Sequence, residues 1–195
     1  MNVGIITTFV IGGIFMVSML AFNQQLMTGS QEFMLSTISQ DYLDDVVTVL
    51  SNDFNRIGYN TGIAIPFTTI QGDDILFQAD AYDNDNYGST NIRWYLDTSD
   101  PVTSSKNPND YYLKRVGPIT ANTYGTIKFP VTLFKIKYYT ADGTVTNDKN
   151  SVKKIEVQIM AESSDPYTMG SESEEFYPRN VWKRIFVPNN INLPY

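Results

Sequence analysis

The sequence predicts an α+β fold in which a long N-terminal helix, membrane-spanning in its first part, packs on an antiparallel β-sheet domain. Three observations predict it. Residues 3–22 carry no charge and almost no polar side chain. Apolar residues then recur every three or four positions as far as Ile57, with no proline before Pro66, which is the period of an amphipathic helix. From Ile63 onward, short runs of β-forming residues alternate with turn residues.

The composition argues against catalysis. The chain of 195 residues has no Cys and no His, which removes thiolate sites, the commonest general base and the commonest transition-metal ligand. We find no G-x-S-x-G sequence and no glycine-rich phosphate loop. The net charge of −7 has the wrong sign for attraction to nucleic-acid phosphates. We therefore expect no enzyme activity, no cofactor and no nucleic-acid partner.

Charge is unevenly distributed along the chain. Residues 1–105 contain two basic residues, Arg56 and Arg93, and twelve acidic ones. Residues 106–195 contain twelve basic and nine acidic residues. This asymmetry permits head-to-tail contacts between copies of the chain, and ordinary solvated surface is the alternative interpretation.

The uncharged segment from Val3 to Phe22 has the length of a membrane span. A hydrocarbon core of about 30 Å requires about 20 apolar helical residues. A cleaved secretory signal would have a basic start and a small-x-small cleavage site, and a buried helix of a soluble protein is a further alternative. We expect residues 1–22 to form a transmembrane or filament-core helix. Because the segment that follows is acidic and lacks basic residues before Arg56, we expect the β domain to lie outside the membrane.

The helical pattern continues through residues 23–58 as an amphipathic segment. We expect one helix from about residue 3 to about residue 57, roughly 80 Å long at 1.5 Å per residue, and Gly58 supplies a stop. Gly12, Gly13 and Gly29 either weaken this helix as hinges or allow close approach of another helix. The predicted apolar stripe consists of Leu35, Ile38, Tyr42, Val46, Leu50, Phe54 and Ile57.

Residues 59–195 are expected to form one β domain. Alternation of polar and apolar residues over 154–159 indicates a sheet with one wet face. Pro66 and Pro130 indicate edge strands or bends, and Asp142-Gly143 indicates a hairpin turn. The predicted strands are Ile63–Ile70, Ile75–Ala81, Asn91–Leu96, Tyr111–Val116, Thr126–Tyr139, Val152–Ala161 and Trp182–Val187.

This arrangement resembles the type IV pilin and pseudopilin superfamily. The run from Asp53 to Tyr59 is similar to the acidic-x-x-Arg-x-Gly-Tyr element that closes the long helix in minor, J/W-type members. Residues 91–96 and 112–115 resemble their paired strands. Ile5 stands where the family has a glutamate.

The resemblance implies a structural subunit of a type IV pilus-like filament or secretion pseudopilus that assembles through its N-terminal helix. Its partners would then be the membrane and copies of itself or related pilin-like subunits. Its location would be the inner membrane, with an extracytoplasmic β domain, or an extracellular filament. The alternative is a single-pass membrane-anchored surface β domain that binds a ligand or a partner protein.

Two sets of residues are candidate sites. Small residues recur every four positions on one face of the first helix, which favours close helix–helix packing. The predicted assembly surface comprises Gly4, Ile5, Thr8, Phe9, Gly12, Gly13, Ile14, Phe15, Leu20 and Phe22. The second set, Asp80, Asp83 and Asp85, offers the oxygen ligands that calcium prefers. We favour an ordinary Asx-turn at these residues and expect no bound metal, and a calcium site is the weaker alternative.

Overall fold

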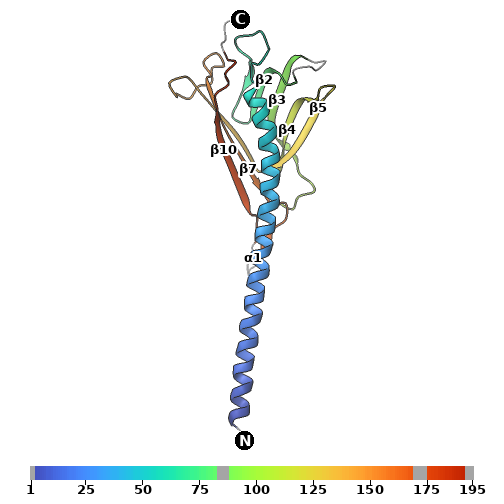
Figure 1. Ribbon diagram of the computed structural model, residues 1–195, viewed down its shortest axis with the longest axis vertical. Coiled ribbons are helices and arrows are strands. Elements are labelled where there is room, and N and C mark those ends of the chain that lie inside the picture. Colours follow the sequence, from blue (N-terminus) through green and yellow to red (C-terminus); the bar gives the residue numbers. More distant parts are fainter. Residues whose placement is uncertain (1–2, 83–87, 169–174, 192–195) are drawn as a thin grey trace.

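A computed structural model describes residues 3–82, 88–168 and 175–191. Helix α1 (Val3–Asn55) is a single helix of 53 residues that continues unbroken through Gly12, Gly13 and Gly29. Its N-terminal part projects from the molecule, and its C-terminal part lies along the β domain (Figure 1). The prediction of one long helix packed on an antiparallel β domain is confirmed.

The β domain contains two main sheets, and all of their strand pairs are antiparallel. One has five strands in the order β1-β2-β3-β4-β5, and the other has three in the order β10-β7-β6. A short pair, β8 and β9, was not predicted. The strands are β1 (Phe67–Ile70), β2 (Asp74–Asp80), β3 (Ser89–Pro101), β4 (Tyr111–Thr120), β5 (Thr123–Val131), β6 (Leu133–Tyr139), β7 (Lys154–Glu162), β8 (Tyr167–Thr168), β9 (Glu175–Phe176) and β10 (Arg179–Phe186).

Two predicted strands differ from the structure. The predicted strand Ile63–Ile70 begins only at Phe67, directly after Pro66. The run Thr126–Tyr139 is two strands, because the chain leaves the five-stranded sheet after Val131 and enters the three-stranded sheet at Leu133. Thr132 makes this transfer, and both its amide and its hydroxyl donate to the carbonyl of Met160, at 2.9 and 3.1 Å. Pro130 lies in β5, an edge strand, as its missing N–H donor predicts.

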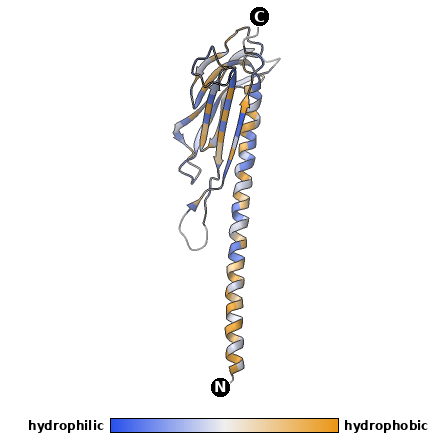
Figure 2. Cartoon of the chain, turned by 90° about the vertical axis from the view of Figure 1, so that its left-hand side faces the viewer, coloured by the Kyte–Doolittle hydropathy of each residue, from blue (hydrophilic) through white to orange (hydrophobic). Residues whose placement is uncertain are grey.

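Both sheets lie on the same side of α1 (Figure 2). In β7, Ile155, Val157 and Ile159 are buried and alternate with partly exposed residues, so the predicted one-sided pattern is confirmed. The ring of Phe54 contacts the rings of Phe77 and Phe186, with centroids 5.8 and 5.2 Å apart. These contacts close a core between the last turns of α1 and the two sheets.

The predicted apolar stripe on α1 is correct only in its upper half. Val46, Leu50, Phe54 and Ile57 are buried, but Ile38 and Tyr42 are 47% and 51% exposed. The buried face continues downward through Leu43 and Ser39 instead. Since a helix turns 100° per residue, spacings of four residues drift away from a fixed face, and a polar residue occupies the lowest buried position.

Candidate functional site: an exposed apolar helix held by a buried ion pair

The N-terminal part of α1 exposes apolar side chains on all sides. Within the described residues, α1 is long and apolar enough to cross a membrane, and none of its most apolar stretch is buried by the rest of the chain. Phe9, Phe15 and Phe22 are 78%, 68% and 59% exposed. Exposed apolar surface on this scale requires lipid or another protein to cover it.

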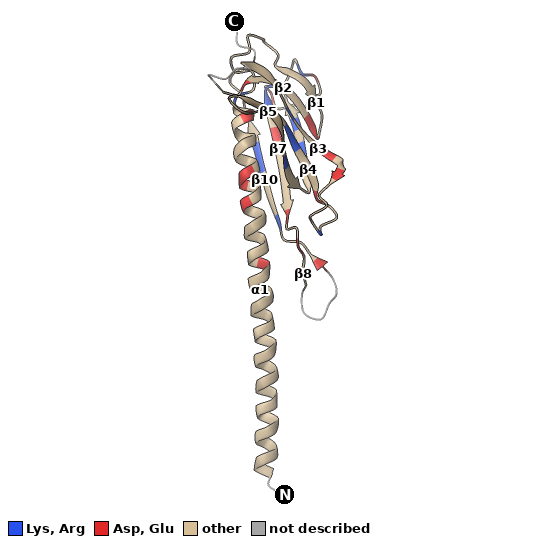
Figure 3. Cartoon of the chain, turned by 90° about the vertical axis from the view of Figure 1, so that its right-hand side faces the viewer, with Lys and Arg blue, Asp and Glu red and all other residues tan. Residues whose placement is uncertain are grey.

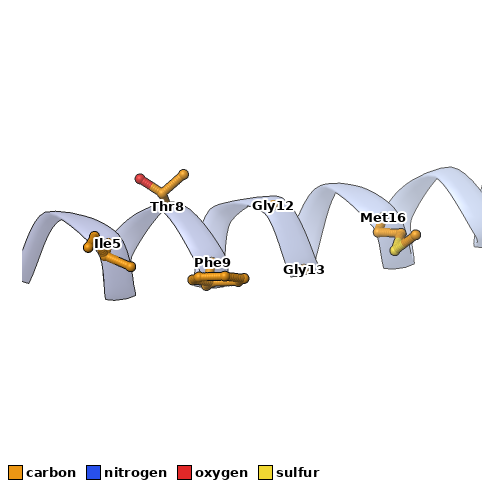
Figure 4. Close-up of a pocket in the computed structure, with 6 residues that line it drawn as sticks. All are labelled: Ile5, Thr8, Phe9, Gly12, Gly13 and Met16. Atoms are coloured by element: carbon orange, nitrogen blue, oxygen red, sulfur yellow. The ribbon is translucent and has the colours of Figure 1, made fainter.

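The predicted small-residue face contains a shallow hollow. Ile5, Thr8, Phe9, Gly12, Gly13 and Met16 line it (Figure 4). The two glycines leave a gap between the side chains of Phe9 and Met16, and a Cβ atom added at either glycine would meet nothing within 4 Å. The close approach that glycine permits is therefore not used inside this chain, although a second helix could use it.

The hydroxyl groups in the first part of α1 are satisfied within the helix. Thr7, Thr8 and Ser18 donate to the carbonyls of Val3, Gly4 and Ile14, at 3.0, 2.9 and 2.9 Å. An unsatisfied polar group costs several kcal/mol in hydrocarbon, so these bonds make the segment compatible with an apolar surrounding.

Exposed apolar residues continue beyond the length of a bilayer. After the polar sequence at residues 23–25, Met27, Phe33 and Met34 are 74%, 74% and 61% exposed. Met34 precedes the buried Leu43 by nine residues, about two and a half turns, so it lies on the side of α1 opposite the sheets. This second exposed stripe consists of Leu26, Met27, Phe33, Met34 and Ile38.

A buried ion pair holds the upper end of α1 on the β domain. Asp53 in the last turn of the helix receives hydrogen bonds from Nε and Nη2 of Arg115 in β4, at 2.6 and 2.9 Å. The indole Nε1 of Trp94 in β3 donates to the same carboxylate at 2.7 Å. The Asp53 and Arg115 side chains are only 2% and 4% exposed. The remaining described contact of Arg115 is from Nη1 to the carbonyl of Pro118, at 2.6 Å.

The chemistry of this pair follows from its position. A carboxylate at a helix C-terminus is unfavourable because of the helix dipole, and α1 has no basic residue in its last turn. Arg115 supplies the missing cation from another element. Although burial opposes the charged form of Arg115, its hydrogen bond and proximity to Asp53 raise the pKa of its guanidinium. Asp53 and Arg115 both lie in segments that we singled out from the sequence, but their separation along the chain does not indicate that they form an ion pair.

Gly58 fixes the path of the chain after the helix. Its φ of 77° lies in the left-handed region, and its amide donates to the carbonyl of Gln78 at 2.9 Å. A Cβ atom at Gly58 would come within 2.8 Å of the carbonyl oxygen of Asn190. The predicted stop at Gly58 is therefore confirmed, and its glycine is required for both conformation and space.

A second polar contact ties the middle of α1 to β10. Nδ2 of Asn180 donates to Oγ of Ser39 at 2.7 Å and to the carbonyl of Ser36 at 3.0 Å. Ser39 is 2% exposed and occupies a position that an apolar residue would usually fill. This bond, together with Asp53 some four turns above it, fixes the helix to the domain at two heights.

The predicted calcium ligands are only partly described. Asp80 is buried at the end of β2, and its Oδ2 accepts a hydrogen bond from Nδ2 of Asn60 at 2.7 Å. Asp83 and Asp85 lie outside the described residues. Among the described residues there is no group of three or more acidic side chains placed to hold a metal ion. The favoured interpretation, an ordinary Asx-turn, and the weaker calcium alternative therefore both stay untested at Asp83 and Asp85.

The fold and the exposed helix together define a class of architecture, one apolar N-terminal helix partly packed on an antiparallel β domain. This arrangement is consistent with pilin-like architecture. Comparison with known proteins adds no relative, since no family model, no curated protein and no solved structure matches the chain significantly.

Proposed function

We propose that this chain is a non-enzymatic structural subunit that is anchored in a membrane by α1 and assembles into a pilus-like filament or pseudopilus through the same helix. Its partners are copies of itself or related subunits. The β domain lies outside the membrane and forms the surface of the assembly.

The observation that carries this proposal is the length of the exposed apolar helix. The segment from Val3 to Ile38 has 36 residues and would extend about 54 Å, whereas the hydrocarbon core of a bilayer is about 30 Å thick. Lipid can cover residues 3–22 but not the second exposed stripe as well. Neighbouring helices in a filament would cover both, and the gap at Gly12 and Gly13 provides a place for close approach.

A simple membrane anchor for a ligand-binding β domain is the competing function. Such an anchor has no need for Phe33 and Met34 to be apolar, because these residues stand in water between the membrane and the domain. Exposed apolar surface in water favours association. The second exposed stripe therefore favours assembly over a solitary anchor.

The sharpest test places a charge on the second exposed stripe, outside the hydrocarbon. We expect the wild-type chain to occur in ordered fibres in material sheared from producing cells, as seen by negative-stain microscopy. Met34→Asp should insert into the membrane normally but lower the fibre yield by about tenfold or more, because burying an unpaired carboxylate between helices costs several kcal/mol.

Thr103→Asp adds the same charge at an exposed loop position in the β domain and serves as the matched control. It should leave fibre yield unchanged. If the wild-type chain is found only as a monodisperse monomer in detergent, or if Met34→Asp assembles like wild type, the filament proposal is wrong.

A further inference from the structure

The chain carries two surfaces of opposite charge on different elements. One is the side of α1 turned away from the sheets, and the other is the face of the three-stranded sheet turned away from α1. We call them the acidic helix face and the basic sheet face. Figure 2 shows the strands on one side of the helix, so the side of α1 turned away from them is not covered by the β domain.

The acidic helix face contains Asp41, Asp44 and Asp45, all exposed. No Lys or Arg occurs in α1, and its acidic residues lie in the part beside the β domain (Figure 3). Ile38, Asp41, Tyr42 and Asp45 line a small hollow on this face. An apolar floor with a carboxylate at either end suits a lysine side chain, which lays its stem on apolar surface and keeps its ammonium beside negative charge.

The register of the three-stranded sheet assembles the basic sheet face. Lys135 and Lys183 flank Gln158, while Lys137 and Ile185 flank Glu156. The face includes five basic and two acidic side chains, so its net charge is +3, against −3 for the acidic helix face. The basic residues are Lys135, Lys137, Lys154, Arg179 and Lys183, and the acidic ones are Glu156 and Glu162.

Two of these lysines form no ion pair within the described part of the chain. On the five-stranded sheet, cations are paired within the chain: Lys114 lies 2.7 Å from both Asp97 and Asp100, and Lys128 lies 2.7 Å from Asp100. Lys135 and Lys137, by contrast, are exposed and form no ion pair with any residue that the structure describes. The cations available to a partner therefore include Lys135 and Lys137 on the three-stranded sheet.

The distance between neighbouring charges on the basic sheet face is close to the distance between neighbouring charges on the acidic helix face. Lys135 and Lys137 are alternate residues of one strand, so their side chains lie on one face about 7 Å apart. Asp41 and Asp45 are one turn apart on a helix, with Cβ atoms about 6 Å apart. Two parallel ion pairs can therefore form between the faces without distortion of either element.

We propose that the basic sheet face of one copy docks on the acidic helix face of a second copy, with Lys135 and Lys137 beside Asp41 and Asp45. The exposed Val181 and Ile185 of the sheet add apolar contact beside Ile38 and Tyr42. Because the two faces are different surfaces of the chain, the contact is heterologous and leaves a free face at each end. It therefore extends to a row of copies. This inference rests on the proposed filament and identifies its surface contact.

Charge reversal in the full chain tests the contact. Lys135→Glu with Lys137→Glu, or Asp41→Lys with Asp45→Lys, should each lower fibre yield about tenfold at low salt, because two attractive pairs become repulsive. Combining all four substitutions should restore the yield to within about threefold of wild type, since the charges are then exchanged. Individual reversals that assemble like wild type, or a combination that gives no recovery, would overturn the pairing.

Disulfide trapping provides an independent measurement, because the chain contains no native Cys. A chain that carries both Asp45→Cys and Lys137→Cys should give a ladder of linked multimers on mild oxidation, whereas either substitution alone should give dimers at most. Asp45→Cys with Thr103→Cys is the control and should give no ladder. If the wild-type chain forms fibres but the first pair gives no ladder, the proposed contact is wrong and the filament proposal is unaffected. If the first pair gives a ladder but no fibres form, the contact is supported and the filament proposal is wrong. If neither is observed, both proposals are wrong.

Discussion

Replacing Asp53 by asparagine should destabilise the β domain more than any other single isosteric change in the last turn of α1. The substitution preserves side-chain volume but removes the charge that faces Arg115. It also turns an acceptor of three described hydrogen bonds into a group with one acceptor and one donor end. Because Arg115 donates to both oxygens of Asp53, the new amide N–H faces an N–H of Arg115 in either orientation, and in one of them it also faces the N–H of Trp94.

The magnitude follows from burial. Because the Asp53 and Arg115 side chains are 2% and 4% exposed, the cation left by Asp53→Asn has little access to water. Breaking a buried pair by removing one partner costs about 3–5 kcal/mol. For a chain of this size, a loss of that order lowers the Tm by roughly 6–20 °C.

The assay is thermal unfolding of the full chain in detergent, followed through the fluorescence of Trp94, which contacts Asp53, and Trp182. Asp97→Asn is the matched control, since Lys114 keeps its second ion-pair partner, Asp100, at 2.7 Å, and it should change the Tm far less. Asp53→Leu combined with Arg115→Met should be more stable than Asp53→Asn alone, because no charge is then left buried. A loss of less than about 1 kcal/mol for Asp53→Asn would refute the argument that this pair fastens the helix.

Two further predictions concern the end of the helix and the ion pair between Asp97 and Lys114. Gly58→Ala should destabilise by about 1–2 kcal/mol or more in urea unfolding, because its φ is 77° and the new Cβ would lie 2.8 Å from the carbonyl oxygen of Asn190; Gly29→Ala, in open space on the helix, should instead be neutral or stabilising. The hydrogen bond from Lys114 lowers the pKa of Asp97 to about 2, so Asp97 contributes stability that is complete above about pH 4 and is lost as the pH falls towards 2. An NMR titration should show this pKa and its rise in Lys114→Met, and an unchanged value in that variant would contradict the assignment.

Helices and strands whose apolar residues recur with a regular period were predictable from the sequence. The unbroken α1 follows from the absence of proline before Pro66 and from apolar residues at every turn. Strand β7 follows from strict alternation at 154–159. In both elements the local pattern and the tertiary environment select the same side of the backbone, so the pattern alone is sufficient.

Other features were not predictable, because partners distant in sequence decide them. Ser39 is buried since Asn180, 141 residues later, donates to its hydroxyl. Asp53 is a buried ion-pair partner only because β4 brings Arg115 beside the helix. Residues 126–139 divide into two strands at Thr132, whose hydroxyl donates a hydrogen bond to the carbonyl of Met160 in β7. The spacing of residues within one segment of the sequence does not predict contacts with a distant segment.

Rigid attachment of α1 to the β domain links the two proposed assembly surfaces. The ion pair at Asp53 and the contact between Asn180 and Ser39 hold the helix at two heights, so the domain cannot rotate about the helix axis without breaking one of them. The side of α1 on which Met34 lies is therefore fixed relative to the acidic helix face and the basic sheet face. In the proposed filament, packing of helices below would then set the position of the charged contact above. Loosening the attachment with Asn180→Ala should consequently reduce the regularity of the fibres, measured as the sharpness of their helical layer lines, before it reduces their yield. Fibres of unchanged order would show that the two surfaces assemble independently.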